Sequence, residues 1–276
     1  MIDPFLQSEY DNSAKVAGSD AMLAALPGMA AEFRVRHAFA DYGVAYGPSA
    51  RQKFDLFWPD AGRAAPIAIF VHGGYWQHSD RAAWSHLAGG LLAHGIAVAM
   101  PSYDQCPAVT MPVVVENLLA VAPVLFRLHG RKMLAIGHSA GGHLAAMLLA
   151  QDWRAQNWAA QGLPADLVYA ALPISGLFDL PPLCQTHVND ALGMDATVAR
   201  SLSPMFMPSP HRPMHAIVGG DEGVEYARQS RELAAAWGGN WETSPGHHHF
   251  NIVGELADPA SRLVAVACGL AHDHRD

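Results

Sequence analysis

The chain has 276 residues, of which 51% are hydrophobic and 15% are charged, and its formal net charge is −8 at pH 7. This length suits a single domain with one large core, and the low charged fraction excludes an intrinsically disordered chain. The negative charge provides no basic patch for a phosphate backbone, so nucleic acid is not an expected partner. Three scattered cysteines form no disulfide framework, and we expect free thiols in a reducing cytoplasm.

The N-terminal residues 1–15 include an early acid and lack the continuous apolar run of a signal peptide. No uninterrupted apolar run reaches the roughly 18 residues that a membrane span needs, so we expect no membrane association. The expected protein is cytoplasmic and binds a small-molecule substrate. The sequence leaves its oligomeric state open.

Short apolar segments of strand length alternate with helix-like stretches along the chain. The first two segments alternate apolar and polar residues, as antiparallel edge strands do, whereas the later ones are continuous apolar runs typical of strands covered on both faces. We therefore expect a single α/β domain over residues 1–276, with a mostly parallel eight-stranded sheet and helices on both faces. The expected strands are 33–39, 53–58, 67–71, 96–100, 133–136, 169–174, 214–218 and 240–243, and the expected helices are 81–94, 112–129, 140–151, 224–237 and 259–271.

Some segments do not fit this alternation. Residues 1–30 precede the first expected strand, and residues 151–167 and 181–212 are rich in Pro, Trp and Met. Ligands bind, and lids are inserted, where segments follow strand ends in an open α/β sheet. We expect residues 1–30 and 181–212 to cover the functional site.

The most informative motif is the G-x-S-x-G sequence around Ser139, which follows an apolar run and leads directly into a helix-like segment. A serine hydroxyl is a poor nucleophile at neutral pH, so it must be presented on a sharp turn beside a base and oxyanion donors. Gly137 and Gly141 suit this turn, because a side chain at either position would crowd the adjoining strand or helix. The motif and its flanks predict that Ser139 is a nucleophile.

A nucleophilic serine needs a histidine base and an acid that fixes the tautomer of that histidine. The expected acid is Asp221, at the end of an apolar strand, with Glu222 and Asp179 as alternatives. Residues 247–249 are three adjacent histidines, each a candidate base. Because adjacent side chains diverge and no metal-binding spacing accompanies them, we expect no metal site.

A strand also runs into the sequence His-Gly-Gly-Tyr-Trp at 72–76, which is similar to the HGGG-type loop of esterases and lipases. Backbone N–H groups of such a loop stabilise the oxyanion of a tetrahedral intermediate, together with the N–H of the residue after the nucleophile. His72 is expected to hold the loop and not to react. The expected oxyanion hole consists of Gly73, Gly74, Tyr75 and Ala140.

These motifs together resemble the arylformamidase, or kynurenine formamidase, branch of the α/β-hydrolase superfamily. In that family the catalytic histidine directly precedes a phenylalanine, which implies His249 as the base, with Ser139 as the nucleophile and Asp221 as the acid. The resemblance extends over the whole chain, at residues 9–12 (EYDN), 72–76 (HGGYW), 102–107 (SYDQCP), 137–144 (GHSAGGHL), 174–180 (ISGLFDL), 219–222 (GGDE) and 246–250 (GHHHF).

The resemblance implies hydrolysis of N-formylkynurenine to formate and kynurenine, through an acyl-enzyme and without a cofactor. A carboxylesterase acting on small acyl or aryl esters through the same triad is the alternative, since the motifs do not separate the two. Tyr75, Trp76 and Tyr103 are candidate contacts for an aryl group, whereas Phe178 is expected in the core. A small acyl pocket with a roomy aryl side would favour the formamidase.

Overall fold

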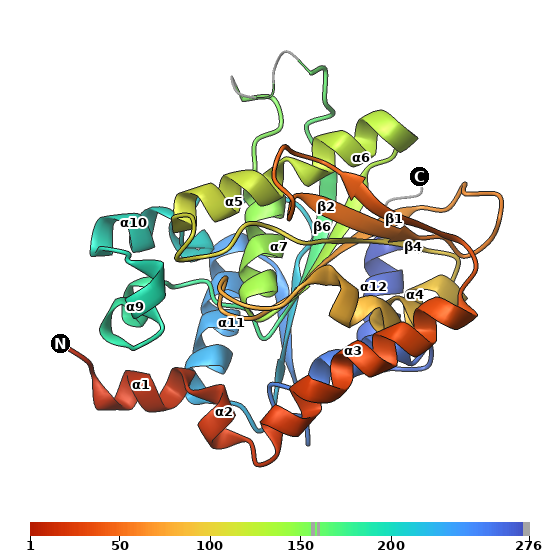
Figure 1. The fold of residues 1–276 in the computed structure, drawn as a ribbon. Coiled ribbons are helices and arrows are strands. Elements are labelled where there is room, and N and C mark those ends of the chain that lie inside the picture. The colour runs from red at the N-terminus through yellow and green to blue at the C-terminus, as the bar shows by residue number, and fades with distance from the viewer. Residues whose placement is uncertain (156–157, 159–160, 273–276) are drawn as a thin grey trace.

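The structure is a computed structural model that describes residues 1–155, 158 and 161–272 (Figure 1). The expected segment 151–167 is described only in part, because residues 156–157 and 159–160 lie outside the described residues. At the centre is an eight-stranded sheet in the order β1-β2-β4-β3-β5-β6-β7-β8. Its strands are β1 (Ala40–Ala45), β2 (Lys53–Phe57), β3 (Ile67–Val71), β4 (Ala97–Pro101), β5 (Met133–His138), β6 (Val168–Ile174), β7 (His215–Gly219) and β8 (Asn240–Ser244).

The sheet is antiparallel only at its first edge. β1 pairs antiparallel with β2, and β2 pairs antiparallel with β4, whereas the remaining neighbours are parallel. The central strands alternate their side chains between two cores: Ile67 and Ile69 of β3 belong to one, and Ala68 and Phe70 to the other. The expected α/β-hydrolase architecture, a mostly parallel sheet with two covered faces, is confirmed.

Helices cover both faces of the sheet (Figure 1). The first core lies beneath α5 (Met111–Leu119), α6 (Val121–His129), α7 (Ala140–Ala150) and α11 (Val224–Trp237). The second lies beneath η1 (Arg81–Ala88), α4 (Gly89–Ala93), η4 (Ile252–Ala257) and α12 (Arg262–His272). The other elements are α1 (Pro4–Tyr10), α2 (Asn12–Lys15), α3 (Ser19–Arg36), η2 (Pro181–Gln185), α9 (Asn189–Leu192), α10 (Ala196–Ser201) and η3 (Pro204–Phe206).

The expected strand at 33–39 is wrong, because α3 continues to Arg36 and β1 begins only at Ala40. Nine of residues 21–31 are Ala, Leu or Met, which are strong helix formers, and α3 continues through Pro27 and Gly28. At the end of this helix Phe33 stacks on His37 with ring centroids 5.2 Å apart, which is the i, i+4 contact of helical spacing. Helical packing therefore overrides the short alternating pattern.

The expected helix at 112–129 is divided into α5 and α6 at Ala120. The segment Met111–His129 has a mean hydropathy of 1.7 and is 44% buried, so by length and composition alone it could cross a membrane. In the fold, Val114, Leu118 and Leu125 belong to the core that α7 shares.

The N-terminal helices lie across the end of the sheet at which the parallel strands terminate. In Figure 1 the red helices α1 and α2 lie beside α11 and below α9. The backbone N–H of Asp3 donates to the Gln185 carbonyl at 2.9 Å, which ties the N-terminus to the insertion at 181–212. Both segments thus approach the strand ends where the sequence places Ser139.

Candidate active site

Ser139 sits on a strained turn between β5 and α7. Its backbone angles are φ 57° and ψ −122°, in the positive-φ region that L-residues rarely adopt. The turn is packed so tightly that a Cβ on Gly141 would lie 2.0 Å from the Val71 carbonyl oxygen. Only glycine fits there, which explains why the strand can pass into the helix with Ser139 at the apex.

The hydroxyl of Ser139 lies at the end of a hydrogen-bonded chain. Its Oγ is 3.0 Å from His249 Nε2, and His249 Nδ1 is 2.6 Å from an oxygen of Glu222. The His249 and Glu222 side chains are only 6% and 1% exposed. Because Nδ1–H donates to the carboxylate, Nε2 keeps its lone pair toward the serine, as a general base requires.

Glu222, and not Asp221, is the acid that the structure places against His249. The second oxygen of Glu222 accepts hydrogen bonds from Ser175 Oγ at 2.5 Å and from the Gly219 backbone N–H at 2.7 Å. Asp221 stands exposed at the tip of the turn, where its backbone N–H donates to the His247 carbonyl. The expected acid is therefore displaced by one residue, because the turn directs the longer side chain of Glu222 back beneath the strand end.

The other alternative acid, Asp179, is also occupied elsewhere. Arg228 Nη2 donates to its carboxylate at 2.8 Å, and the same guanidinium binds Glu225 and Glu232 on α11. These carboxylates raise the pKa of Arg228 above its ordinary value. Asp179 thus joins the segment after β6 to α11 and does not reach His249.

The ring of His249 is flanked by two buried rings. His138 and Tyr226 lie with ring centroids 4.8 Å and 4.9 Å from that of His249. His138 Nε2 donates to the His249 carbonyl at 2.8 Å, and burial lowers the pKa of His138 well below its ordinary value. A neutral His138 thus supports the backbone of His249 without adding a second positive charge beside it.

The two neighbouring histidines serve the turn. His247 contacts Ser244 Oγ through Nδ1 at 2.9 Å and Glu255 through Nε2 at 3.1 Å. His248 Nδ1 accepts from the backbone N–H groups of Phe250 and Asn251. The three side chains diverge to different partners, so only His249 faces Ser139.

The loop after β3 brings backbone donors beside the nucleophile. Gly74 has φ 109°, and a Cβ there would lie 2.5 Å from the His78 carbonyl oxygen. A Cβ on Gly73 would lie 3.0 Å from Ser139 Cβ, so the loop packs directly against the nucleophile. Within the described residues no acceptor binds the N–H of Gly74 or Tyr75, and Ala140 begins α7, where helical N–H groups are free.

Two of the expected aryl contacts are buried under this loop and do not line the cavity. Tyr103 is fully buried, stacks on the His72 ring at 4.7 Å and donates its hydroxyl to the His72 carbonyl at 3.1 Å. Trp76 is fully buried against His143, with ring centroids 5.2 Å apart. His72 is structural, as expected: its Nδ1–H donates to the Gly73 carbonyl at 2.8 Å, and burial lowers its pKa to about 4.

Ser139, His249 and Tyr75 open into a cavity of about 720 Å³. One wall is mainly apolar and comes from α3 and η1, with Leu26, Pro27 and Trp84 among its residues. A second wall comes from α1, α2 and the insertion, and most of its residues are polar. They are Gln7, Tyr10, Asp11, Asn12, His187 and Val188.

Comparison with known proteins identifies the family of this chain. The model of the BD-FAE family matches residues 54–236, more than half of the chain. This chain belongs to the BD-FAE family. Kynurenine formamidase of Salmo salar is 30% identical over 230 residues, covering 78% of this chain and 76% of that protein. Kynurenine formamidase of Danio rerio is 29% identical over 229 residues, covering 78% and 76%.

Solved structures extend the comparison to the whole fold. A protein from Silicibacter sp. tm1040, provisionally described as a thioesterase, superposes on this chain with a TM-score of 0.86 and is 35% identical. The superposition covers 95% of this chain and 98% of the Silicibacter chain. An esterase of Pyrobaculum calidifontis, with a TM-score of 0.70 at 16% identity over 99% of each chain, shares the fold. This BD-FAE family member is an enzyme, a hydrolase with the α/β-hydrolase fold.

Sequence reasoning missed several residues of this BD-FAE site. Ser175, which holds Glu222, occurs in a motif that the sequence offers, but nothing in the motif marks its hydroxyl as a donor. Asn12 lies in the EYDN sequence at 9–12, to which the resemblance gave no role, and Trp84 lines the cavity from a segment with no motif of its own. Their positions follow from the way α1, α2 and η1 fold over the strand ends, which no local pattern records.

Proposed function

We propose that this chain is a serine hydrolase that cleaves an aryl formamide such as N-formylkynurenine to formate and kynurenine. The observation that carries the proposal is the buried Ser139–His249–Glu222 chain, whose two hydrogen bonds are 3.0 and 2.6 Å long. The choice of substrate class is supported by the similarity to kynurenine formamidases. The one from Salmo salar aligns with 78% of this chain.

In the proposed mechanism, Ser139 Oγ attacks the formyl carbonyl carbon while His249 Nε2 takes its proton. The carbonyl oxygen becomes an oxyanion that accepts hydrogen bonds from the N–H groups of Gly74, Tyr75 and Ala140. His249 then gives its proton to the aryl nitrogen, the C–N bond breaks and the arylamine leaves a formyl ester on Ser139.

Water completes the cycle by the same route. His249 takes a proton from water as its oxygen attacks the formyl-serine carbon, and the second oxyanion occupies the same three donors. Its collapse breaks the ester bond, releases formate and returns the proton to Ser139 Oγ. Glu222 remains ionised throughout and stabilises the imidazolium of His249.

The walls of the cavity support an aromatic leaving group with polar substituents. A formyl group needs little room beside Ser139, so most of the cavity of about 720 Å³ is available to the arylamine. Trp84, Leu26 and Pro27 provide the apolar wall for a ring, and Asp11 and His187 face it from the polar wall. Such an asymmetric cavity suits an aryl group that carries a charged side chain.

Purified protein should be assayed with N-formyl-L-kynurenine, p-nitrophenyl acetate and an acetyl thioester, beside Ser139→Ala and Asp221→Asn. We expect formamide turnover with kcat/KM of at least about 10⁴ M⁻¹s⁻¹, an ordinary value for a true substrate. Ser139→Ala should abolish it, whereas the exposed Asp221→Asn serves as a matched control with wild-type rates.

A second candidate is hydrolysis of esters or thioesters by the same triad. The observation in its favour is the whole-length likeness, at 35% identity, to the Silicibacter protein provisionally described as a thioesterase. Serine-dependent turnover of the ester or thioester with no formamide hydrolysis would move the function to this class. Turnover that survives Ser139→Ala would reject the serine mechanism itself.

A further inference from the structure

The side chain of Asn12 lies in a closed group of hydrogen bonds with two tyrosines, here called the Asn12 cluster (Asn12, Tyr75 and Tyr226). Asn12 Nδ2 is 2.7 Å from the Tyr226 hydroxyl and 3.3 Å from the Tyr75 hydroxyl. The two hydroxyls are 2.9 Å apart, and Tyr75 also donates to the Tyr10 carbonyl at 2.5 Å. Three separate parts of the chain, the α1–α2 junction, the loop after β3 and α11, therefore meet at one point.

The hydrogens of this cluster have one consistent arrangement. The hydrogen of the Tyr75 hydroxyl goes to the Tyr10 carbonyl, which can only accept, so the Tyr75 oxygen must accept from its other partners. Tyr226 then donates to Tyr75, and the two N–H groups of Asn12 donate one to each hydroxyl. Burial raises the pKa of both tyrosines above the ordinary range, so both hydroxyls keep their hydrogens.

The cluster bears on two groups of the proposed mechanism. The backbone of Tyr75 supplies an oxyanion donor, and its φ of 48° is strained for a residue with a side chain. Such a conformation persists only where surrounding contacts hold it, and the hydroxyl of Tyr75 is the part of the residue that is held. The Tyr226 ring, in turn, packs 4.9 Å from His249.

The N-terminal segment gives this cluster a fixed support. Tyr10 donates its hydroxyl to Glu225 at 2.8 Å and accepts from Gln229 Nε2 at 2.7 Å, both on α11. The Glu225 backbone N–H donates to Glu9 at 3.2 Å. Residues 9–12 are therefore attached to the same helix that carries Tyr226, and Asn12 cannot shift without breaking several buried contacts.

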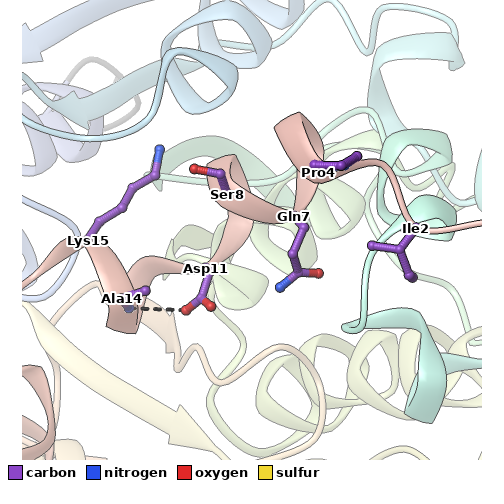
Figure 2. A pocket seen from close by; sticks show the side chains of 7 residues that line it. All are labelled: Ile2, Pro4, Gln7, Ser8, Asp11, Ala14 and Lys15. Carbon is purple, nitrogen blue, oxygen red and sulfur yellow. Dashed lines mark hydrogen bonds between the residues drawn. The ribbon is translucent and has the colours of Figure 1, made fainter.

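The two sides of α1 and α2 differ in what they face. A surface hollow of about 600 Å³ lies along these helices. In Figure 2, Gln7 and Asp11 point to one side of the ribbon and Ser8 and Lys15 to the other. Gln7 and Asp11 also line the catalytic cavity. Gln7 and Asp11 thus line both the surface hollow and the cavity, whereas Asn12 lines the cavity and donates its amide to the two tyrosine hydroxyls.

We propose that Asn12 is a positioning residue, which holds the Tyr75 hydroxyl and thereby keeps the Tyr75 backbone N–H aimed at the oxyanion. The N-terminal segment is then part of the catalytic apparatus and not only a wall of the cavity. The inference rests on the proposed serine mechanism, but it is independent of whether the substrate is a formamide or an ester.

The test compares Asn12→Leu, Tyr75→Phe and the double variant with the wild type, using p-nitrophenyl acetate as substrate. Affinity for trifluoroacetophenone, which forms a tetrahedral oxyanion adduct with a catalytic serine, is measured in parallel. Each single variant should lower kcat by about 10- to 100-fold, at or below the effect of losing one oxyanion donor. KM should stay within about twofold, the inhibition constant should rise with the loss of kcat, and the double variant should be no worse than Tyr75→Phe.

The control is Asp3→Ala, which removes the N-cap of α1 without touching the cluster. It should lower thermal stability while kcat and inhibitor affinity stay at wild-type values. An equal loss of kcat in Asp3→Ala, a rise of KM at constant kcat in Asn12→Leu, or additive effects in the double variant would each overturn the proposal.

Two further measurements keep the outcomes separate. If circular dichroism shows that Asn12→Leu does not fold, Tyr75→Phe alone decides, since this variant removes the hydroxyl that Asn12 holds, and unchanged kcat in it would reject the proposal. If the wild type hydrolyses neither ester nor formamide, the proposed function fails. If the wild type is active, Ser139→Ala is inactive and Asn12→Leu keeps wild-type kcat, only the positioning role of Asn12 is rejected.

Discussion

On the strand side of the cavity, the turn of Ser139 and the glycines of the loop are held by backbone geometry, and Glu222 is held by Ser175 and the Gly219 backbone. On the opposite side, α1 to α3 are held by side-chain hydrogen bonds and partly exposed apolar contacts. A Cβ at Gly141 would lie 2.0 Å from a backbone oxygen, so the turn tolerates no alternative. In α3, by contrast, Leu23 and Met29 are 40% and 49% exposed.

We expect the strand side to carry the reacting groups and the helical side to select among substrates. Atoms that move protons need positions fixed to a fraction of an ångström, and buried strand ends and glycine contacts supply such positions. A wall that selects among substrates can be built from side chains that change without disturbing the sheet. Apart from Asn12, which we propose to position Tyr75, variants on the two sides should therefore differ in kind, with losses of kcat on the strand side and changes of KM on the helical side.

The largest contrast is expected between two adjacent acids on the strand side. Glu222→Gln removes the charge that stabilises the His249 imidazolium and should lower kcat by about 10⁴-fold, the loss seen when a triad acid becomes an amide. Asp221→Asn changes an exposed side chain and should leave kcat within about twofold. Steady-state kinetics of both variants decide the assignment, and the reverse result would restore Asp221 as the acid.

Buried histidines on the strand side should make stability depend on pH. Burial lowers the pKa of both His72 and His143 to about 4. The unfolded chain therefore binds more protons between pH 6.5 and 4, and the free energy of unfolding should fall by about 2 kcal/mol per histidine from pH 7 to 5. Urea unfolding at several pH values measures this fall. In His143→Gln the free energy of unfolding should fall by about 2 kcal/mol less than in the wild type. Parallel curves for the two proteins would contradict a lowered pKa of His143.

The loop that faces the nucleophile gives a smaller effect. Gly74→Ala forces a Cβ to within 2.5 Å of the His78 carbonyl, and the displaced N–H groups should lower kcat by about 100-fold with little change in KM. Gly95→Ala is the matched control, because Gly95 has φ 74° and open space around it. Both variants carry backbone strain, and only Gly74→Ala should lose activity. Equal kcat values in the two variants would mean that this loop takes no part in catalysis.

The smallest effect is expected in the apolar wall of the helical side. Leu26→Ala removes part of the surface that a ring would contact and should raise KM for an aryl substrate by about fivefold, since one or two methylene groups contribute about 1 kcal/mol. Met29→Ala, on the same helix but outside the cavity lining, should change neither constant. A fall of kcat in Leu26→Ala would mean that α3 also positions reacting groups.

Sequence patterns predicted the strand side well, because its geometry is local. G-x-S-x-G between an apolar run and a helix leaves one arrangement of the backbone, and Ser139 is found there on the strained turn. The G-x-x-H-F resemblance likewise selects the histidine that faces Ser139. In both places, the residues that determine the structure lie within a few positions of one another.

The remaining assignments depend on turns and long-range packing. Asp221 and Glu222 are adjacent carboxylates at a strand end, and only the fold of the turn decides which one points inward. Trp76 and Tyr103 follow strands that do lead to the site, but their rings turn into the core. Aromatic character alone indicates neither direction, because cavities and cores favour the same side chains.

The Asn12 cluster has a consequence for the order in which the protein becomes functional. Asn12 is synthesised before its partner Tyr226, which is 214 positions further along the chain. Contacts between such distant residues form late, because the intervening chain must first be ordered. A nascent or refolding chain should therefore acquire its sheet and its buried tryptophans before it acquires turnover. A lag between the recovery of fluorescence and the recovery of activity would record the docking of the N-terminal segment.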